Sequence, residues 1–258
     1  MRILEENTAN NAWGDALGSV VHEGVEVTSR GMLTKELINN TLVVDMSYPE
    51  VNLPERKLNI KFRAAEAAWI LSGDNRVDTI SKYCKAYRTF SDNSVFMAGA
   101  YGPPVVDQLS YIARALGEDM YTRRAVLTIW RPRPYPSKDI PCTVSLQWLI
   151  RDDKLHCIAN MRANDIWLGT PYDIFTFSMI SQYIIAEFKR SINEDMVPGL
   201  LYLNAASLHL YEKDWKIAKE AYIESDSTLV VDSLWKGNDV DFNNGREFIE
   251  FLWEQANS

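Results

Sequence analysis

Two strand-like segments near the middle of the chain flank a short polar turn. They run from Val144 to Ile150 and from Leu155 to Met161, and the sequence RDDK at 151–154 lies between them. Strand-like segments joined by so short a polar connection are typical of a β-hairpin. The preceding segment, 131–141 (RPRPYPSKDIP), contains four prolines and is predicted to be a loop. The sequence therefore predicts a sheet that is entered from an irregular loop.

Further helices and strands are predicted around this hairpin without a regular alternation. Asp173 to Arg190 carries apolar residues at helical spacing, with an acidic residue at its N-terminal end. Segment 59–71 is predicted to be a helix that is capped by Gly73. The other predicted helices are Asn10–Val21 and Arg246–Gln255, and the other predicted strands are Arg124–Trp130, Leu200–Ala206 and Thr228–Val231. We expect an α+β fold with a sheet core. Because no repeat or linker composition interrupts the chain, we expect one domain over residues 1–258.

The overall charge of the chain limits the kinds of partner it can bind. Its 258 residues include 27 Lys and Arg against 35 Asp and Glu, which gives a formal charge of −8. This balance argues against a nonspecific nucleic-acid or membrane binder, but it leaves room for a small anion held by a few arginines. The N-terminal residues lack the basic and apolar regions of a signal peptide, and no apolar run could span a membrane. We therefore expect a cytoplasmic protein, in a bacterium or in the host of a virus.

Cys142 is the candidate nucleophile among three cysteines, which are too few for a disulfide framework. Cys84 and Cys157 are expected to be small buried apolar residues, as free cysteines usually are. Cys142 differs because it lies where the proline-rich loop meets a strand, with arginines in neighbouring segments. Nearby cations lower the pKa of a thiol and raise its thiolate fraction. His22 and His156 are expected to be structural or surface residues, and no metal site is expected from three histidines.

Reactive and charged residues follow one another along the chain in a specific order. Cys142 precedes Arg162, which begins the segment RANDIWLGTPYD at 162–173. Taken singly, such arginines and carboxylates are typical of solvated or capping side chains. Further landmarks are Arg30, Glu66 in AEAAWILSGD, the pair Tyr101-Gly102, the pair Arg123-Arg124, and His209-Leu210-Tyr211. Together, over residues 29–211, they resemble the active-site core of the thymidylate synthase family, whose signature is R-S-x-D-x-x-L-G-x-P-x-N.

The resemblance implies a fold and a set of roles. The fold would be a single domain with a mixed β-sheet and flanking helices, and two copies would pack sheet to sheet as a homodimer. Cys142 would be the nucleophile, and Glu66 and Tyr101 would organise the water that removes a proton. A nucleotide phosphate would meet Arg30 and Arg162 of one subunit and Arg123 and Arg124 of its partner, while His209 and Tyr211 contact the sugar. Gln147 would orient the backbone or the substrate, Ala163 and Asn164 would line the substrate site, and Tyr87, Asp165 and Gly169 would line the site of the co-substrate 5,10-methylenetetrahydrofolate.

Asp173 departs from the family signature, which ends in asparagine. In the resemblance this side chain faces N3 and the C4 substituent of the pyrimidine. Uracil presents a donor and an acceptor there, whereas cytosine presents an acceptor at N3 and a donor at N4. An ionised aspartate is an acceptor only, so it can accept from N4 and share a proton with N3. A mispaired buried polar edge costs about 1–3 kcal/mol, which favours a cytosine nucleotide by roughly ten- to hundred-fold.

Other departures resemble the cytidylate hydroxymethylase branch of the family. They are Cys142-Thr143, the turn LIRDDKL, the block MRAND and Ser207-Leu208-His209. Tyr87 stands where synthases carry a tryptophan, and the final residues FLWEQANS lack their hydrophobic tail, so water is expected to reach an intermediate that synthases protect. Ala163 replaces a serine and leaves both CMP and dCMP open. The alternatives are a thymidylate synthase or a deoxyuridylate hydroxymethylase acting on dUMP, and a non-catalytic nucleotide-binding descendant.

Overall fold

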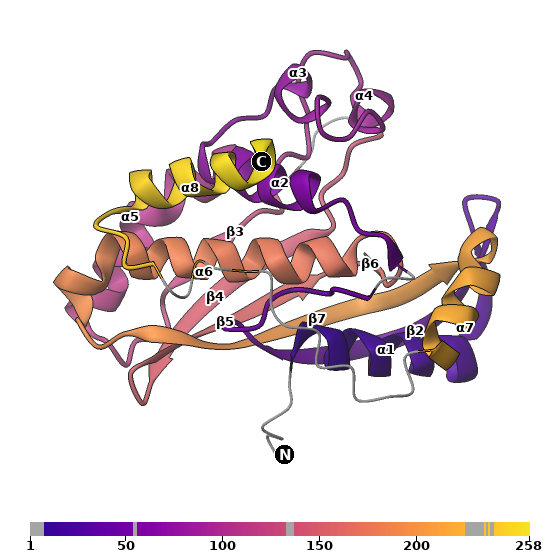
Figure 1. The fold of residues 1–258 in the computed structure, drawn as a ribbon, viewed down its shortest axis with the longest axis horizontal. Helices are drawn as coiled ribbons and strands as arrows, with labels where there is room; N and C mark the ends of the chain where they lie inside the picture. The colour runs from indigo at the N-terminus through magenta and orange to yellow at the C-terminus, as the bar shows by residue number, and fades with distance from the viewer. Residues whose placement is uncertain (1–7, 54–55, 133–136, 225–234, 236, 238–239) are drawn as a thin grey trace.

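One mixed sheet organises the chain, with helices packed against it (Figure 1). The structure is a computed structural model, and it describes residues 8–53, 56–132, 137–224, 235, 237 and 240–258. Seven strands of this described part form the sheet in the order β1-β2-β7-β5-β4-β3, and β6 pairs with β7. The strands are β1 (Val25–Ser29), β2 (Met32–Asp45), β3 (Val126–Thr128), β4 (Thr143–Arg151), β5 (Lys154–Met161), β6 (Asn164–Asp165) and β7 (Val197–Tyr211). The predicted α+β class with a mixed sheet is confirmed.

The predicted hairpin is the antiparallel pair β4–β5. Asp152 and Asp153 form its two-residue turn with φ angles of 52° and 57°, a conformation that matches the twist of the flanking strands. β5 then runs parallel to β7, and α6 (Thr170–Ile192) crosses between them. A parallel neighbour needs such a long crossover. The crossover places the first turn of α6 beside the end of β5.

The predicted helices are all present. α1 (Ala9–Glu23) and α6 pack on the sheet, and α2 (Ile60–Leu71) and α8 (Gly245–Asn257) pack on α6. The side chain of Asn59 caps α2 by accepting from the backbone of Phe62, and Gly73 has the positive φ of 68° expected for the residue after a helix end. The structure adds α3 (Val77–Ile80), α4 (Tyr87–Phe90), α5 (Gly102–Glu118) and α7 (Trp215–Glu224).

Three predicted strands differ in extent or cannot be compared. The strand expected over Arg124–Trp130 is shorter, because only Val126–Thr128 pairs with β4. The strand expected over Leu200–Ala206 is longer, because β7 pairs with β2 along nearly its whole length. The strand expected over Thr228–Val231 lies outside the described residues.

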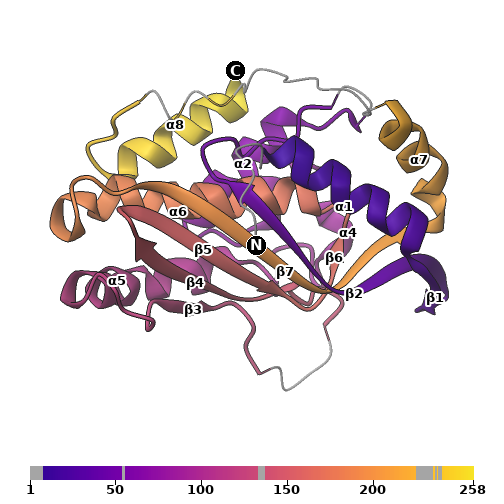
Figure 2. The same cartoon turned by 90° about the horizontal axis from the view of Figure 1, so that it is seen from below.

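The two faces of the sheet differ in their cover. Figure 2, seen from below, shows β4, β5 and the first half of β7 in front of α6, with no described helix over this side. Along β4, Leu146, Trp148 and Ile150 are buried toward α6, where the indole of Trp148 donates to Ser181 (2.9 Å). The alternating residues Gln147 and Leu149 are half-buried and face the open side. Among the described residues, no helix is long and apolar enough to cross a membrane.

Candidate active site

Cys142 lies immediately before β4, where the backbones of β4 and β5 meet. The backbone N–H of Arg162 donates to the carbonyl oxygen of Cys142 (2.8 Å), so the end of β5 holds the cysteine in place. The Arg162 guanidinium donates to the carbonyls of Pro141 (2.9 Å) and Ile140 (3.0 Å) and lies over the ring of Trp130. Arg162 thus fixes the last turn of the proline-rich loop and places a positive charge beside the thiol.

The thiol of Cys142 experiences opposing influences on its pKa. Burial raises the pKa, and the charge of Arg162 lowers it. Asp173 and Asp165 raise it further, whereas Arg30 lowers it. Because burial and the carboxylates prevail, the net shift is upward, and the thiol is protonated at rest. A nucleophilic role would therefore need a group that takes its proton.

Tyr101 connects the start of α5 to the start of β4. Its hydroxyl oxygen accepts from the hydroxyl (3.0 Å) and the backbone N–H (3.3 Å) of Thr143, the residue after Cys142. Burial and the charges of Asp173 and Cys142 raise the pKa of Tyr101 well above its usual value. The phenol therefore keeps its proton and can donate it in a hydrogen bond within the site.

Glu66 and Asp173 bring two carboxyl groups to this place from different helices. Glu66 is a half-buried residue in the otherwise buried face of α2, and Asp173 lies in the first turn of α6. Burial raises the pKa of Glu66 to about 7, against the opposing hydrogen bond that Tyr87 donates to it. Burial, followed by the charges of Glu66 and Asp165, raises the pKa of Asp173 well above its usual range. Near neutral pH, Glu66 can therefore exchange a proton, and the upward shift of the Asp173 pKa favours its protonated form.

The loop between β5 and α6 is built around Asp165. Its Oδ1 accepts from the backbone N–H groups of Trp167 and Leu168 (both 2.9 Å). Gly169 leaves room at the turn, because a Cβ there would lie 3.3 Å from Oδ2 of Asp173. Asn164 is buried, accepts from the hydroxyl of Thr170 (2.7 Å) and contacts the sulfur of Met161 with its NH₂ group. Asn164 therefore braces the loop, with Ala163 half-buried beside it.

Two further segments approach from the far half of the sheet. His209 on β7 pairs with Asp165 on β6, and its ring packs edge-on against Tyr211 with centroids 5.2 Å apart. The Nδ1 atom of His209 is buried and has no hydrogen-bond partner among the described residues. Arg30 lies in the turn of the β1–β2 hairpin, where Arg30 (φ 51°) and Gly31 (φ 79°) both have left-handed backbones. This turn carries an exposed arginine close enough to influence the charge of Cys142.

Arg123, Arg124 and Gln147 lie away from Cys142 in the same chain. The side chain of Gln147 donates to the backbone oxygen of Arg123 (2.9 Å) and so supports the chain before β3. Gln147 is five residues beyond Cys142 along β4, a separation of about 16 Å in an extended strand. Arg123 and Arg124 are exposed. These three residues do not complete the group of side chains around Cys142 within one subunit.

Several residues join the candidate site without having been predicted. They include Thr143, which donates to Tyr101, and Trp130, which lies beneath Arg162. Arg56 donates to the carbonyl oxygen of Trp167 (2.7 Å), lies over the ring of that residue and is influenced by the charge of Asp165. Thr143 could have been predicted as a site residue from the sequence, because it directly follows Cys142. The segment around Arg56 offers none, because its contact with Trp167 joins residues 111 positions apart.

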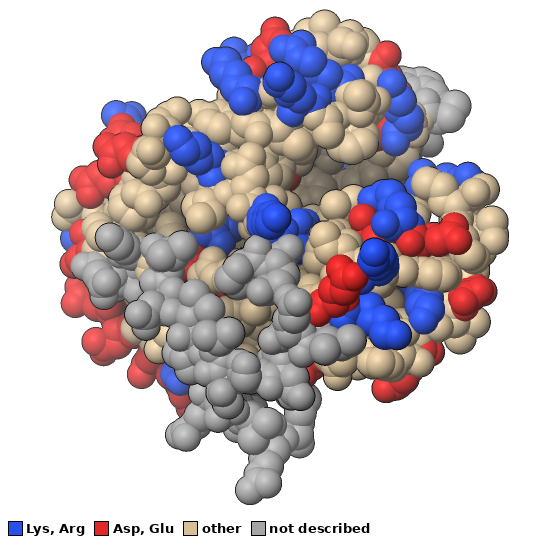
Figure 3. All heavy atoms as spheres, turned by 45° about the vertical axis from the view of Figure 1, so that its right-hand side comes forward, with Lys and Arg blue, Asp and Glu red and all other residues tan. Residues whose placement is uncertain are grey.

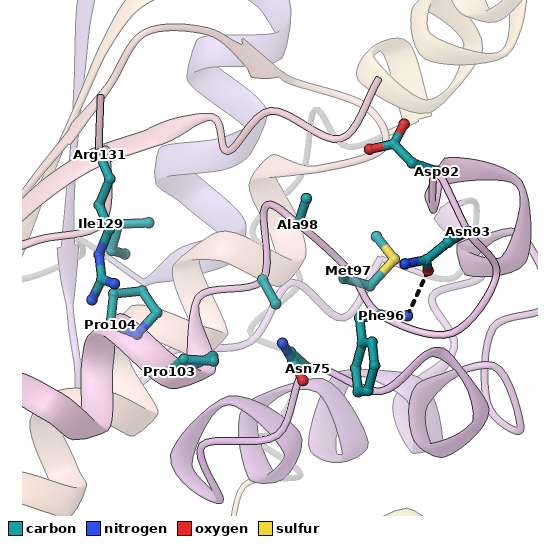
Figure 4. Close-up of a pocket in the computed structure, with 11 residues that line it drawn as sticks. Asn75, Asp92, Asn93, Phe96, Met97, Ala98, Pro103, Pro104, Ile129 and Arg131 are labelled. Carbon is teal, nitrogen blue, oxygen red and sulfur yellow. Dashed lines mark hydrogen bonds between the residues drawn. The ribbon is translucent and has the colours of Figure 1, made fainter. Parts of the chain in front are cut away.

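The surface near α4, β6 and α7 is hollowed. Figure 3 shows Lys and Arg side chains around this hollow, although the whole chain is acidic. A separate cavity of about 250 Å³ lies beside the start of α5 and is lined by Asn75, Phe96, Met97, Pro103 and Arg131, among others (Figure 4). None of the predicted site residues lines that cavity. In the described part of the chain, no group of His, Cys, Asp and Glu side chains could hold a metal ion.

Known proteins resemble this chain over most of its length. The sequence profile of the family described as "Thymidylate synthase" matches residues 11–228. A protein of Methanosarcina acetivorans named "Putative thymidylate synthase" is 25% identical over 222 residues, which cover 84% of this chain and 93% of that protein. Proteins named "Deoxyuridylate hydroxymethyltransferase" from Bacillus phage SP01 and Pseudomonas phage M6 are each 28% identical, covering 85% and 83% of this chain and 63% and 62% of their own lengths. With most of its length matched, the chain belongs to the thymidylate synthase family.

Proposed function

We propose that this chain is a cytidylate 5-hydroxymethyltransferase acting on dCMP or CMP. It would transfer the one-carbon unit of 5,10-methylenetetrahydrofolate to C5 of the nucleotide and let water add, giving the 5-hydroxymethyl nucleotide and tetrahydrofolate. Family membership supports the coarser activity, which is folate-dependent one-carbon transfer to C5 of a pyrimidine nucleotide. The observation that carries the finer proposal is the carboxyl group of Asp173 at the position where the family signature has asparagine.

The surroundings of Asp173 favour cytosine. Burial and the neighbouring carboxylates of Glu66 and Asp165 raise the pKa of its carboxyl and so favour the protonated form in the empty site. Its O–H can donate to N3 of cytosine while its other oxygen accepts from N4–H. The shared proton then lies between a carboxylate and a basic ring nitrogen, a charge-assisted hydrogen bond that the weakly basic O4 of uracil does not form as well. A single aspartic acid thus satisfies the whole edge of the base.

The chemistry would proceed through a covalent bond to Cys142. The thiol of Cys142 passes its proton to water in the site, the thiolate adds to C6, and the electron pair displaced toward C5 is stabilised through the N3 proton that Asp173 supplies. C5 then bonds to the methylene carbon of the co-substrate. Water held by Glu66 and Tyr101 removes the C5 proton, for which a carboxyl with a pKa of about 7 is well matched, and the electron pair of that C–H bond expels tetrahydrofolate to form an exocyclic methylene. Addition of water to the exocyclic methylene and expulsion of Cys142 then release the product.

The remaining residues would bind and orient the two substrates. Asp165 fits the co-substrate because both backbone donors use Oδ1, and the described residues give Oδ2 no donor. His209 and Tyr211 would contact the sugar, and the unpartnered Nδ1 of His209 is a polar atom available to the ligand or to a water. The phosphate would meet Arg30 and Arg162. Charged groups that hold the phosphate orient the base far from the reacting carbon.

The second subunit would complete the phosphate site. Arg123 and Arg124 are exposed and lie before β3, away from Cys142, and none of the described helices covers the sheet face opposite α6 (Figure 2). A homodimer that packs these faces together would bring the two arginines to the partner's site. We further propose that residues 1–258 act as a single catalytic domain and that neither nucleic acid nor membrane is a partner.

An assay with four nucleotides tests the proposal. CMP, dCMP, UMP and dUMP are each incubated with labelled methylenetetrahydrofolate, and the products are identified by mass. We expect a product heavier by CH₂O from a cytosine nucleotide, with tetrahydrofolate released. Hydroxymethyl-dUMP instead would favour the second candidate, to which the names of the two phage relatives point. A methylated nucleotide with dihydrofolate would identify a synthase and contradict the proposal.

The role of Asp173 has its own test. Asp173→Asn replaces the acid with an amide that matches uracil, so we expect the ratio of kcat/KM for cytosine over uracil nucleotides to fall by about ten- to hundred-fold. Asp165→Asn serves as the matched control, because it makes the same change in a neighbouring carboxylate whose Oδ1 is held by backbone N–H groups. An unchanged base preference in Asp173→Asn would contradict recognition of the base by Asp173.

A further inference from the structure

Tyr87 is in contact with the carboxyl group of Glu66. The tyrosine begins α4, and its hydroxyl donates to Oε1 of Glu66 on α2. The resemblance to the family assigns Tyr87 to the wall of the folate site, which requires only its ring. The hydrogen bond shows that its hydroxyl is engaged by the residue expected to handle the proton of C5.

We propose that Tyr87 is the positioning residue of Glu66, and that its hydroxyl both orients the carboxylate and favours its ionised form. The inference rests on the proposed function, in which Glu66 organises the water that removes the C5 proton. It goes further by identifying the group that makes Glu66 able to accept a proton near neutral pH.

The ring of Tyr87 is fixed against the same face of α2 that carries Glu66. Phe62 and Trp69 lie four residues before and three residues after Glu66, which places all three side chains on one side of the helix. The Tyr87 ring lies 5.7 Å from that of Phe62 and 6.0 Å edge-on from that of Trp69. The ring of Phe90, in the same helix as Tyr87, also packs against it, with centroids 6.0 Å apart. With three aromatic rings packed against its own ring, Tyr87 has little freedom to point its hydroxyl elsewhere than at Glu66.

Among the described residues, none of the titratable groups around Glu66 other than Tyr87 stabilises its negative charge. The titratable groups that face Glu66 and Tyr87 are Asp173 and Tyr172 of α6, Cys84 before α4 and Tyr101 before α5. All four are neutral or negative, so they cannot stabilise a carboxylate by opposite charge. Burial raises the pKa of Glu66, and the hydrogen bond from Tyr87 opposes that shift, which leaves the pKa at about 7.

Tyr87→Phe tests this role because it removes the hydroxyl and keeps the ring. Protein labelled with ¹³C at the glutamate carboxyl is titrated by NMR, and the Glu66 signal is assigned by its loss in Glu66→Gln. We expect the pKa of Glu66 to rise by about one to two units in Tyr87→Phe, as loss of a hydrogen bond to an ionised group predicts. The control is Tyr83→Phe, in which the lost hydroxyl bonds to Asn257 instead (2.9 Å), and there the Glu66 titration should not move.

Kinetics with the full-length enzyme give a second readout. In Tyr87→Phe, the acidic limb of the kcat profile should move to higher pH by the same amount, so that kcat falls about ten-fold at pH 7 and recovers above pH 9. A several-fold rise in the KM for methylenetetrahydrofolate, with an unmoved Glu66 titration and kcat profile, would overturn the inference and leave Tyr87 as a lining of the folate site. If the wild-type protein turns over no pyrimidine nucleotide, the proposed function fails, whereas the NMR titration still decides the role of Tyr87.

Discussion

At the scale of single residues, the carboxyl groups of the candidate site lower the stability of the folded state. Glu66 and Asp173 are half-buried residues on two helices, and no cation is among the groups that shift the pKa values of their carboxyls. Carboxylates in a stable core are normally paired, as Glu50, in the segment between β2 and α2, is with Arg63 of α2 in this same protein. The unpaired arrangement fits a site whose groups must exchange protons with a ligand.

The first prediction concerns stability and pH at Glu66. Its pKa is about 7 in the folded protein and near 4.5 when the chain is unfolded, so the folded state holds the proton more tightly. Stability from this group is present below pH 4.5 and is lost as the pH rises toward 7. We expect Glu66→Gln to raise the free energy of unfolding by on the order of 2–3 kcal/mol at pH 8, and by less than about 1 kcal/mol at pH 5.

Urea unfolding at the two pH values measures this difference. Glu118→Gln makes the same change at an exposed position on α5 and should have little effect at either pH. An equal effect of Glu66→Gln on the free energy of unfolding at pH 5 and pH 8 would show that burial of the ionised carboxylate does not govern how Glu66 affects stability.

The sequence alone could identify many of these residues and their order along the chain, but it could not show which of their side chains touch. The resemblance to the family brings together Glu66, Tyr101, Cys142, Arg162 and Asp173, and the structure has all five near one another through shared electrostatic effects or hydrogen bonds. The contact between Tyr87 and Glu66 could not be predicted in the same way. It depends on how α4 packs against α2, which no local spacing determines.

At the scale of elements, the predictable parts are those with strong local signals. The β4–β5 hairpin has a two-residue aspartate turn, and α6 has a long apolar stripe. α5 was not predicted, although the spacing of Val105, Leu109, Ile112 and Leu116 is helical. β2 is different, because Asn39 interrupts it with a φ of 57° and the neighbouring Ile38 is 81% exposed. Its strand character comes from pairing with β7, which lies far away in the sequence.

The second prediction concerns the start of α5, which carries Tyr101. A Cβ on Gly102 would lie 2.6 Å from the backbone oxygen of Asp74, so the helix start would have to move. We expect Gly102→Ala to destabilise the protein by about 1–3 kcal/mol and to lower kcat, because Tyr101 would be displaced with it. Gly117→Ala is the matched control on the same helix, since nothing lies within 4 Å of its Cβ.

Circular dichroism melting and activity measurements separate the two variants. The control should be as stable as the wild type or more stable by about 0.5–1 kcal/mol, because alanine favours a helix over glycine. Equal behaviour of the two variants would mean that the close contact between α5 and Asp74 does not position Tyr101.

At the scale of the whole molecule, the phosphate site that we propose would be incomplete in one chain. The formal charge of −8 hides a local concentration of cations, of which Arg30 and Arg162 influence Cys142 directly. Arg123 and Arg124 lie elsewhere, before β3. Whole-chain charge could exclude a broad basic surface, but it could not reveal an arginine site that two subunits would share. The half-buried face of β4 and β5 is where such a second subunit would pack.

The last prediction tests this sharing by mixing two inactive proteins. One carries Cys142→Ala, and the other carries Arg123→Ala with Arg124→Ala. If the arginines act across the interface, a mixed dimer has one site with an intact cysteine from the second protein and intact arginines from the first. Random pairing of co-expressed chains makes half of the dimers mixed, each with one working site, so about a quarter of the wild-type activity should return.

The control is the same co-expression with Arg162→Ala in place of the double variant, because Arg162 belongs to the same site as the cysteine of its own chain. Arg162 lies beside Cys142 in one chain, so the mixed dimer would have one site without the cysteine and one without Arg162, and activity should stay near the level of the Arg162→Ala protein alone. If the Arg123 and Arg124 mixture also stayed at the level of its separate components, the two arginines would act within their own chain, and the shared phosphate site would be wrong.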